Sequence, residues 1–379
     1  MTHYKMSDVA VEINERENNP ASSKYERFVG LEHYVSGEVI IRNYGSTENL
    51  ESTMKVFQSG DVLVARRNVY LKRASMVDFD GLTSGDSIVL RAKNPIIGRV
   101  LPFVLNTYSF WDFADQYSDG TMSKRLSPKT LMTYEFDLPD EDELEKFADL
   151  LWAANDTRES YQALLRQTDE LVKSQFIEMF GDLQNNSKGL VLKPLSELIL
   201  IERGGSPRPI EKYITDSPDG VNWIKIGDAT EGSIYITHTK ERIIREGTKK
   251  SRYVQPGDFL LSNSMSFGRP YILTIDGYIH DGWLVLRDND KLFNKLFLHT
   301  LLSSDYAMAS FDSMAAGSVV KNLNKELVGK LRVPVPDMAM QTAFATFVEQ
   351  TDKSKFEIKK AIEKTSALIK SLMQQNLSN

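Results

Sequence analysis

The chain has 379 residues, of which 41% are apolar and 26% charged, so it is long enough for two globular domains of ordinary size. It contains no Cys and its five His residues lie far apart, which excludes disulfides, cysteine nucleophiles and the usual zinc-ligand spacings. Its first residues are acidic where a signal peptide is apolar, it has no run of about eighteen apolar residues, and its net charge of −6 excludes a uniformly basic nucleic-acid binder. We therefore expect a cytoplasmic protein with no metal site and no membrane contact.

The chain begins with a domain and continues into a long helix. Residues 1–138 hold short β-rich runs between Gly, Pro and Asp-Gly turns, which predicts a compact α+β domain. Residues 139–182 have apolar residues at helical spacing and no Gly before Gly181. Asp140 is predicted as the N-cap of this helix, with Glu143 as its capping-box partner, and Gly181 ends it.

The second half of the chain repeats this order of a domain followed by a long helix. Residues 183–335 predict a second α+β domain, and residues 336–379 predict a second long helix. Within the two domains, short helices are expected at 100–117 and 292–311.

An internal repeat with an offset of about 197 residues relates the two halves. Gln-Ser-Gly-Asp-Val-Leu at 58–63 matches Gln-Pro-Gly-Asp-Phe-Leu at 255–260, and Leu-Pro-Asp at 138–140 matches Val-Pro-Asp at 335–337. This period is far too long for a solenoid repeat. The sequence therefore predicts an α+β fold with two tandem pseudo-repeated globular domains, each followed by a long α-helix.

The two long helices share a heptad pattern, which predicts that they pair as an antiparallel coiled-coil spacer. Residues 139–182 hold 12 acidic and 4 basic residues, whereas 336–379 hold 5 acidic and 6 basic, and this opposed bias favours pairing one helix with the other. Polar interruptions also correspond, with Arg158 matching Lys355. Packing of each helix on its own domain and pairing with another protein's helix remain alternatives. The predicted pairing residues are Leu144, Phe147, Leu151, Tyr161, Leu165, Val172, Phe344, Val348, Ile358, Ile362, Ile369 and Leu372.

The sequence contains none of the common catalytic or cofactor-binding motifs. The sequence lacks a glycine-rich cofactor loop, an Asn-Pro-Pro-Tyr tetrapeptide, a phosphate-binding loop and a G-x-S-x-G turn. Asp337 with Glu357 and Lys359 has the form of a metal-dependent nuclease signature, but Asp337 is interpreted as a helix cap from which the other two side chains diverge. We therefore expect a chain that is not itself an enzyme.

The side chains most suited to contacting DNA follow the two Gly-Asp pairs at 60–61 and 257–258. We interpret each pair as a tight turn before a strand, and the loops after these strands differ between the copies. Both loops carry Arg, Asn or Ser, which contact phosphates and base edges, and a basic stretch precedes the second strand. The candidate DNA contacts are Arg66, Arg67, Asn68, Lys72, Arg73, Lys124, Arg125, Lys249, Arg252, Ser262, Asn263, Ser264, Arg269, Lys321 and Asn322.

Several segments together resemble the DNA specificity subunit of type I restriction–modification systems. They are Gln-Pro-Gly-Asp-Phe-Leu-Leu at 255–261, Gly-Ser-Val-Val-Lys-Asn-Leu at 317–323, Val-Pro-Val-Pro at 333–336, and Ser-Gln-Phe-Ile-Glu-Met-Phe-Gly-Asp at 174–182. The resemblance covers essentially the whole chain. It is weaker in the first half, where Phe28 and Glu32 stand in place of Trp223 and the Gly-Asp pair at 227–228.

This resemblance implies a non-catalytic subunit in which 1–138 and 183–335 are target recognition domains. Each would read one half of a bipartite site in double-stranded DNA, while the helices 139–182 and 336–379 set the spacer. It also implies partners: modification subunits, expected to be two, which would bind S-adenosylmethionine and methylate adenine, and restriction subunits that join some complexes. No cofactor is expected on this chain. The alternative is a protein-interaction scaffold, with two repeated domains on a coiled-coil spacer and no DNA reading.

Overall fold

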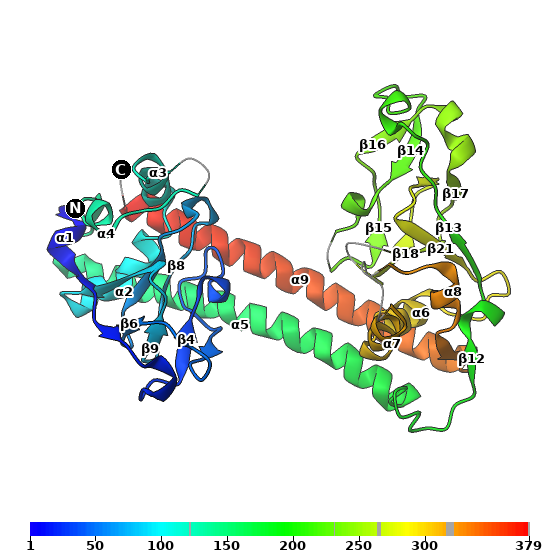
Figure 1. The fold of residues 1–379 in the computed structure, drawn as a ribbon, viewed down its shortest axis with the longest axis horizontal. Coiled ribbons are helices and arrows are strands. Elements are labelled where there is room, and N and C mark those ends of the chain that lie inside the picture. The colour runs from blue at the N-terminus through cyan, green and yellow to red at the C-terminus, as the bar shows by residue number, and fades with distance from the viewer. Residues whose placement is uncertain (121–122, 231, 264–266, 316–321, 378–379) are drawn as a thin grey trace. The chain divides into compact units, whose positions relative to one another are not determined.

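A computed structural model describes residues 1–120, 123–230, 232–263, 267–315 and 322–377 (Figure 1). The chain divides into two compact units. Unit 1 comprises Met1–Ala163 and Lys359–Asn379, and unit 2 comprises Leu164–Ile358. Each long helix therefore contributes one part to each unit. The four-segment division by chain order, with boundaries at 138, 182 and 335, stays a prediction.

Unit 1 contains two sheets that share a core, with strand orders β2-β10-β7-β8 and β3-β6-β9-β4-β5, and a separate pair β1-β11. The strands are β1 Thr2–Lys5, β2 Ala10–Ile13, β3 Arg16–Glu17, β4 Arg27–Val29, β5 Gly45–Ser46, β6 Met54–Phe57, β7 Val62–Ala65, β8 Ala74–Met76, β9 Gly81–Thr83, β10 Ser87–Ala92 and β11 Glu135–Leu138. The helices are α1 Met6–Val9, α2 Pro95–Val104, α3 Tyr108–Gln116, α4 Pro128–Leu131 and the first part of α5 Glu141–Phe180.

Unit 2 repeats this plan, with strand orders β13-β21-β18-β19-β15 and β16-β14-β20-β17 and the pair β12-β22. The strands are β12 Leu192–Pro194, β13 Leu200–Arg203, β14 Val221–Ile224, β15 Tyr235–Ile236, β16 Glu241–Ile243, β17 Arg252–Val254, β18 Phe259–Ser262, β19 Pro270–Leu273, β20 Gly277–Ile279, β21 Trp283–Arg287 and β22 Arg332–Pro334. The helices are α6 Lys295–Leu302, α7 Asp305–Ala315, α8 Lys325–Gly329 and the first part of α9 Met338–Asn376.

The structure confirms the mixed α+β class and the two sheet-rich domains with their long helices. The short helix expected at 100–117 is the pair α2 and α3, and the one expected at 292–311 is the pair α6 and α7. Each predicted range spans two helices and the polar turn between them, residues 105–107 in unit 1 and 303–304 in unit 2.

Strand register confirms that the first half carries the same framework despite its weaker resemblance. In unit 1, Phe28 on β4 pairs in parallel with Leu82 on β9, and in unit 2, Trp223 on β14 pairs in parallel with Tyr278 on β20. Each strand then enters a short 3-10 turn, Leu31–His33 or Ile226–Asp228. Phe28 therefore occupies the position of Trp223, as the sequence predicted.

The central strand of each unit is buried on both faces. In β7, Val62 and Val64 lie in the core beneath the helices, whereas Leu63 and Ala65 lie in the core between the two sheets. In β18, Phe259 and Leu261 lie in the core beneath the helices, whereas Leu260 lies in the core between the two sheets. Because successive strand residues point to opposite faces, this one strand joins both cores of its unit.

A buried aspartate shapes the turn before each central strand. Asp61 accepts a hydrogen bond from the backbone N–H of Gln58 at 2.8 Å and two from Arg91, Nε at 2.7 Å and Nη2 at 2.8 Å. The preceding Gly60 has φ +90°, which glycine adopts without strain. This contact confirms that the Gly-Asp pair forms a tight turn, and it ties that turn to the neighbouring strand β10.

The equivalent aspartate in unit 2 makes the same contacts. Asp258 accepts from the backbone N–H of Gln255 at 3.1 Å and from Arg287, Nε at 3.2 Å and Nη2 at 3.0 Å. Gly257 has φ +95°. The repeat seen in the sequence is therefore a repeat of three-dimensional contacts.

The long helices start and end where their sequences predict. At the start of α9, Asp337 Oδ1 accepts from the backbone N–H of Met340 at 2.9 Å, so Asp337 is a helix cap and not part of a nuclease centre. Gly181 follows α5 with φ +82°. The predicted side-chain cap at Asp140 is corrected, because its Oδ1 instead accepts from the Thr2 hydroxyl at 2.9 Å.

Burial along both helices follows the predicted heptads. Every predicted pairing residue on α5 and α9 is buried or partly buried. Within unit 2, the Phe344 ring lies 5.5 Å from that of Phe176, and Lys355 Nζ lies 2.6 Å from Asp169 Oδ1. These contacts run in opposite directions along the two helices. Within unit 1, Ile369 shares an apolar cluster with residues of the first turns of α5. One continuous coiled coil stays a prediction.

Stability of unit 2 should depend on pH through His299 on α6. Burial lowers the pKa of His299 from 6.5 to about 4; a hydrogen bond to the Pro270 backbone raises it, and the nearby Lys355 charge lowers it. The unfolded chain therefore binds a proton between pH 6.5 and 4 that the folded chain does not. As the pH falls through this window, the free energy of unfolding should decrease. The contribution of His299 to this decrease is up to about 1.4 kcal/mol per pH unit.

Urea unfolding of the full chain and of His299→Gln at several pH values from 7 to 5 measures this contribution. Glutamine can donate to Pro270 but does not titrate. The difference in unfolding free energy between the two proteins should change steadily as the pH falls. A difference that stays constant would contradict the assignment.

Candidate nucleic-acid interface

In unit 1, backbone hydrogen bonds bring two loops from distant parts of the sequence together. The loop 66–73 follows β7, and residues 123–126 lie before α4. The Asn68 N–H donates to Lys124 O at 2.9 Å, and the Leu126 N–H donates to Arg66 O at 2.8 Å. We call these two loops the unit 1 edge. The edge unites the seven candidate residues that the sequence predicted in this half.

Two arginines of the unit 1 edge face one carboxylate. Arg67 and Arg125 are bridge partners across the two loops, and both side chains are 48% exposed. Arg125 Nη2 lies 2.7 Å from Asp86 Oδ1, and Arg67 Nη1 lies 3.9 Å from Asp86 Oδ2. Asp86 therefore holds both guanidinium groups near one place while leaving a net positive charge.

The other candidates of this edge maintain its shape. Arg66 Nε donates to Leu126 O at 3.1 Å, and Arg73 donates to Leu31 O at 2.9 Å and to Arg67 O at 3.1 Å. The Lys124 ammonium pairs with Asp115 at 2.6 Å. These three side chains satisfy backbone or carboxylate groups, so Arg67 and Arg125 present the edge's surface-facing guanidinium groups.

The remaining two candidates sit in left-handed backbone conformations. Asn68 has φ +57° and accepts a hydrogen bond from the Ser123 hydroxyl at 3.1 Å. Lys72 has φ +50°, and its ammonium lies 4.8 Å from the centre of the Tyr108 ring. Both residues turn the loop sharply, which is why it folds back onto its own base.

Unit 2 builds the same backbone framework with different side chains. The Leu323 N–H donates to Asn263 O at 2.8 Å, as Leu126 does to Arg66 in unit 1. The Asn263 N–H donates to Gly282 O at 3.0 Å, as Arg66 does to Asp86 at 2.9 Å. The position held by Arg66 in one unit is therefore held by Asn263 in the other.

Two unit 2 candidates are corrected. Ser262 is fully buried and Asn263 is 1% exposed, although both were predicted as DNA contacts. Asn263 Nδ2 donates to Asp281 O at 2.7 Å, and Ser262 Oγ accepts from the Arg269 N–H at 3.0 Å. Their side chains hold the loop in place, because the loop backbone directs them inward. The predicted contacts Ser264 and Lys321 lie outside the described residues, whereas Arg269 and Asn322 are exposed.

A second carboxylate organises residues that the sequence analysis missed. Asp281 accepts from the Ser206 hydroxyl at 2.6 Å and from Arg208 Nη2 at 3.1 Å, and its backbone O accepts from Arg203 Nε at 3.3 Å. The hydrogen bond from Ser206, with a further contribution from Arg208, lowers the pKa of Asp281. Arg208, whose side chain is 79% exposed, is thereby held beside the loop that follows β18.

A sequence signal for these residues exists. Residues 204–209 read Gly-Gly-Ser-Pro-Arg-Pro, a turn-rich segment that carries an exposed cation. Asp86 matches Gly282 at the repeat offset, next to Asp281. No local pattern shows that these carboxylates meet arginines, since their partners come from other segments.

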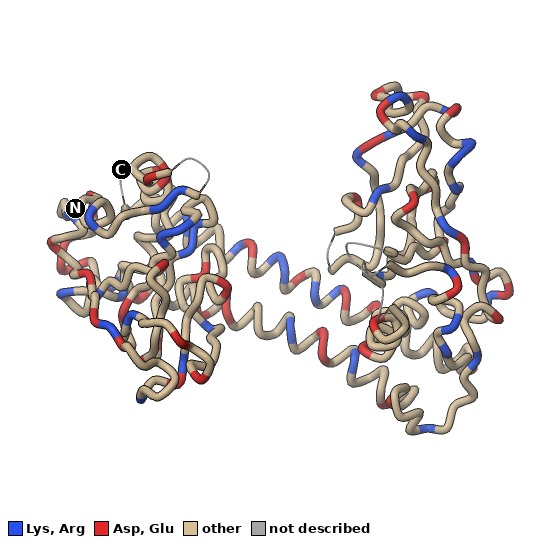
Figure 2. The backbone as a smooth tube through the Cα atoms, in the orientation of Figure 1, with Lys and Arg blue, Asp and Glu red and all other residues tan. Residues whose placement is uncertain are grey.

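The basic stretch of unit 2 lies along the 3-10 helix Arg245–Lys250 and β17, where Figure 2 shows a blue segment of the tube. Lys249 is exposed. Arg252 Nη1 pairs with Glu202 at 2.8 Å, so its charge is partly neutralised. Lys249 is therefore the better phosphate-facing candidate of the two.

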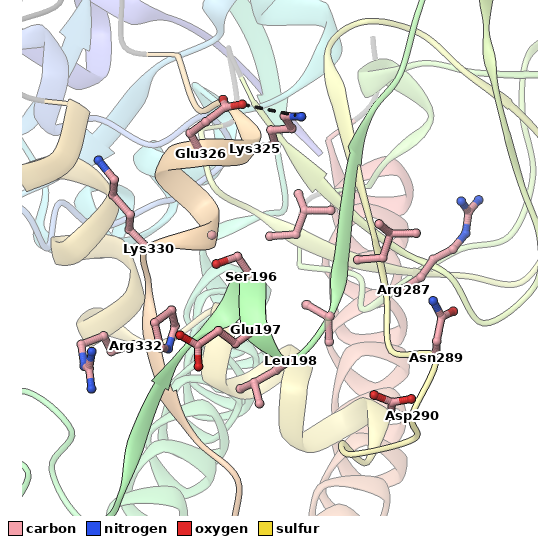
Figure 3. A pocket seen from close by; sticks show the side chains of 15 residues that line it. Ser196, Glu197, Leu198, Arg287, Asn289, Asp290, Lys325, Glu326, Lys330 and Arg332 are labelled. Carbon is pink, nitrogen blue, oxygen red and sulfur yellow. Dashed lines mark ion pairs between the residues drawn. The ribbon is translucent and has the colours of Figure 1, made fainter.

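A hollow of about 990 Å³ in unit 2 does not add to this interface. Figure 3 shows its side chains coming from the segment before β13, the end of β21 and the α8–β22 region. Cations such as Lys325 and Arg332 alternate there with the carboxylates of Glu197, Asp290 and Glu326, and Lys325 Nζ lies 3.7 Å from Glu326 Oε1. Mixed charge of this kind offers no preference for a polyanion.

The described part of the chain shows neither a metal-binding cluster nor a membrane-spanning helix. Among those residues, no group of three or more His, Cys, Asp or Glu side chains is arranged to hold a metal ion. None of the described helices combines the length and the apolar character that crossing a membrane requires.

Comparison with known proteins finds a family model that matches most of the second half. The model, described as type I restriction modification DNA specificity domain, matches residues 188–365. One similar solved structure is described as the structural basis of complex assembly and conformational transition of the type I R-M system. Its sequence identity is 18% and its TM-score is 0.50, and the match covers 99% of this chain and 95% of that chain. The S subunit of the type I restriction–modification system from M. genitalium has 13% identity and a TM-score of 0.56, covering 98% and 95%.

These matches confirm the resemblance stated from the sequence. Nearly the whole chain shares the fold of these proteins, and residues 188–365 match the model of the specificity domain.

The buried candidate Asn263 in unit 2 and the exposed candidate Arg67 in unit 1 should differ in their effect on the stability of the fold. Asn263→Ala removes a buried hydrogen bond and leaves Asp281 O without that donor, which should lower the free energy of unfolding by about 1–3 kcal/mol. Arg67→Ala alters an exposed side chain and should change it by no more than about 0.5 kcal/mol. Urea unfolding of both variants measures this. Equal effects would contradict the division into buried and surface-facing residues.

Proposed function

We propose that this chain is the DNA-reading subunit of a type I restriction–modification complex, in which the two units each read one half of a bipartite site in double-stranded DNA. One observation carries this: the same hydrogen-bonded framework presents different side chains in the two units. Arg66 and Asn263 occupy one framework position. At the same repeat offset, the sequence has Ser264 in place of Arg67 and Asn322 in place of Arg125. A repeated frame with divergent edges is what two sites of different specificity require.

The chemistry of the edges suits base recognition. A guanidinium group can donate two hydrogen bonds to the O6 and N7 of guanine in the major groove. Asp86 fixes Arg67 and Arg125, and Asp281 fixes Arg208, so less side-chain freedom is lost on binding.

Neither domain is strongly basic. Residues 20–138 include 14 basic and 14 acidic residues, and residues 183–335 include 20 basic and 17 acidic residues. Phosphate attraction is therefore modest, and tight binding needs partner subunits.

The long helices set the distance between the half-sites and dock the partners. Two modification subunits, which bind S-adenosylmethionine and methylate adenine, would assemble on the helices, and restriction subunits would join some complexes. The structural relative that concerns complex assembly of the type I R-M system supports partnership with subunits of such a system. The excess acidic charge on 139–182 gives the first long helix a surface unlike that of the domains. Such a complex would act in the cytoplasm, where the DNA lies.

Removing one heptad from each helix tests the spacer role. Deleting 162–168 from α5 and 356–362 from α9 keeps the heptad register of both helices. It shortens each by about 10 Å, equal to about 3 base pairs. The complex should methylate the same two half-sites with a shorter spacer, as sequencing of modified adenines in cells expressing it with its modification subunit would show.

The control replaces the same residues by an unrelated heptad with apolar residues at the same positions, which should leave the spacer unchanged. If the deleted form lost all sequence preference while the complex still assembled, this would contradict the role of the helices in setting the spacer. Assembly without any preference in the parent protein would indicate the protein scaffold instead.

Base reading by the unit 1 edge can be separated from phosphate contact by a matched pair of variants. Arg67→Lys keeps the charge but loses the two-pronged donor geometry, so it should relax the preference at one base pair, at a cost of about 1–3 kcal/mol, as should Arg67→Ala. Methylation of a library of half-site variants measures this. Lys129→Ala, outside the edge, serves as the control. Uniform weakening by Arg67→Ala with full rescue by lysine would mark Arg67 as a phosphate contact.

A further inference from the structure

Unit 1 contains a hollow of about 620 Å³ that shares one residue, Lys72, with the unit 1 edge. It lies beneath α3 and is closed by the last turns of α9 and the middle of α5. Val39, Phe103, Trp111 and Ile369 form apolar walls, and each of these side chains is buried. Its volume lies within the range of about 300–1,000 Å³ that is usual for small-molecule sites.

The charges on this hollow have one sign. Lys72, Arg158 and Lys370 line it, and the described residues of its lining include no Asp or Glu. This is unexpected in a chain with 52 acidic and 46 basic residues. Three cations without a facing carboxylate form a site that favours an anion.

Two of these cations share one aromatic ring. Lys72 Nζ lies 4.8 Å and Lys370 Nζ 4.9 Å from the centre of the Tyr108 ring. The two ammonium groups therefore lie within about 10 Å of each other and repel, and the ring offsets this repulsion only partly. A bound anion between them would remove it.

Buried donors in the lining point to the same chemistry. The indole N–H of Trp111 and the Nε–H of Arg158 are buried and have no hydrogen-bond partner among the described residues. Trp111 is 3% exposed, so bulk water does not satisfy its donor. A buried donor left unsatisfied is destabilising, and a ligand oxygen would satisfy it.

We propose that this hollow binds a small molecule with a flat apolar body and one anionic group, such as a carboxylate, phosphate or sulfonate. The apolar walls take the body, Lys72 and Lys370 take the anion, and the two buried donors take its oxygens or those of the ring substituents. The apolar walls favour a small molecule with an apolar body over a DNA phosphate, because a phosphate group alone would leave Val39, Phe103 and Ile369 without an apolar partner. The proposal does not rest on DNA reading, and Lys72 is the one residue that the hollow shares with the unit 1 edge.

Such a ligand would bridge elements from both ends of the chain. The hollow is lined from α2, α3, α5 and α9 together. Binding would therefore stabilise the attachment of the α9 C-terminal part to unit 1, and would raise the thermal midpoint of the full chain in proportion to ligand concentration.

The test uses naphthalene-1-sulfonate as the probe and the full chain at physiological salt, with affinity from isothermal titration calorimetry and the thermal midpoint as a second readout. We expect saturable binding of one probe per chain and a raised midpoint. Lys370→Gln should weaken binding about tenfold, because one charge-assisted contact is lost. Trp111→Phe, which keeps the ring but removes the N–H donor, should also weaken it. Lys364→Gln, an exposed lysine of α9 outside the hollow, should have no effect.

Uncharged naphthalene-1-sulfonamide tests the need for the anion and should bind at least tenfold more weakly. Equal affinity of the two probes, equal weakening by Lys364→Gln and Lys370→Gln, or the absence of saturable binding would each overturn the proposal. Displacement of the probe by duplex DNA at constant ionic strength would overturn it too, by showing that the cations serve the nucleic acid.

Discussion

The whole structure depends on a buried carboxylate at the start of each central strand. Asp61 and Asp258 are almost completely buried, and burying such a charge costs several kcal/mol unless it is paired and hydrogen-bonded. Here the partners are an arginine of the neighbouring strand, Arg91 or Arg287, and a backbone N–H of the turn. Because these partners come from separate segments, the contact fixes both the turn and the alignment of the strands. The loop that follows each central strand inherits its position from this contact.

The two units show how a fixed frame supports variable surfaces. The backbone bonds that join the strand-end loop to its second segment are the same in both, but they begin at an arginine in unit 1 and at an asparagine in unit 2. Backbone groups carry no side-chain identity, so the frame tolerates substitution along its edges. A carboxylate, Asp86 or Asp281, then determines where the exposed guanidinium groups lie. Specificity can change in such a protein without loss of the fold.

The long helices are held by polar groups as well as apolar ones. Within unit 1, Arg158 Nη2 donates to the buried Asn155 Oδ1 at 2.8 Å, and Glu159 joins Asn155 to Arg42. Within unit 2, Lys355 pairs with Asp169. Arg158 thus makes this contact within α5 itself, whereas Lys355 pairs with Asp169 of the other long helix. Only a polar contact between two helices depends on their register, so the Lys355–Asp169 pair favours one alignment of the helices within unit 2.

The sequence by itself determined the repeat, the two α+β domains, the extent of the long helices and the positions that become buried along them. These features follow from periodicity, caps and turn residues, which are local properties of the chain. It also placed Arg67 and Arg125 among the surface candidates. Only the tertiary structure decided that these two meet at Asp86, that Ser262 and Asn263 point inward, and that Arg208 lies beside their loop. The physical reason is that a loop side chain takes its direction from backbone bonds to distant segments, and no local pattern encodes those bonds.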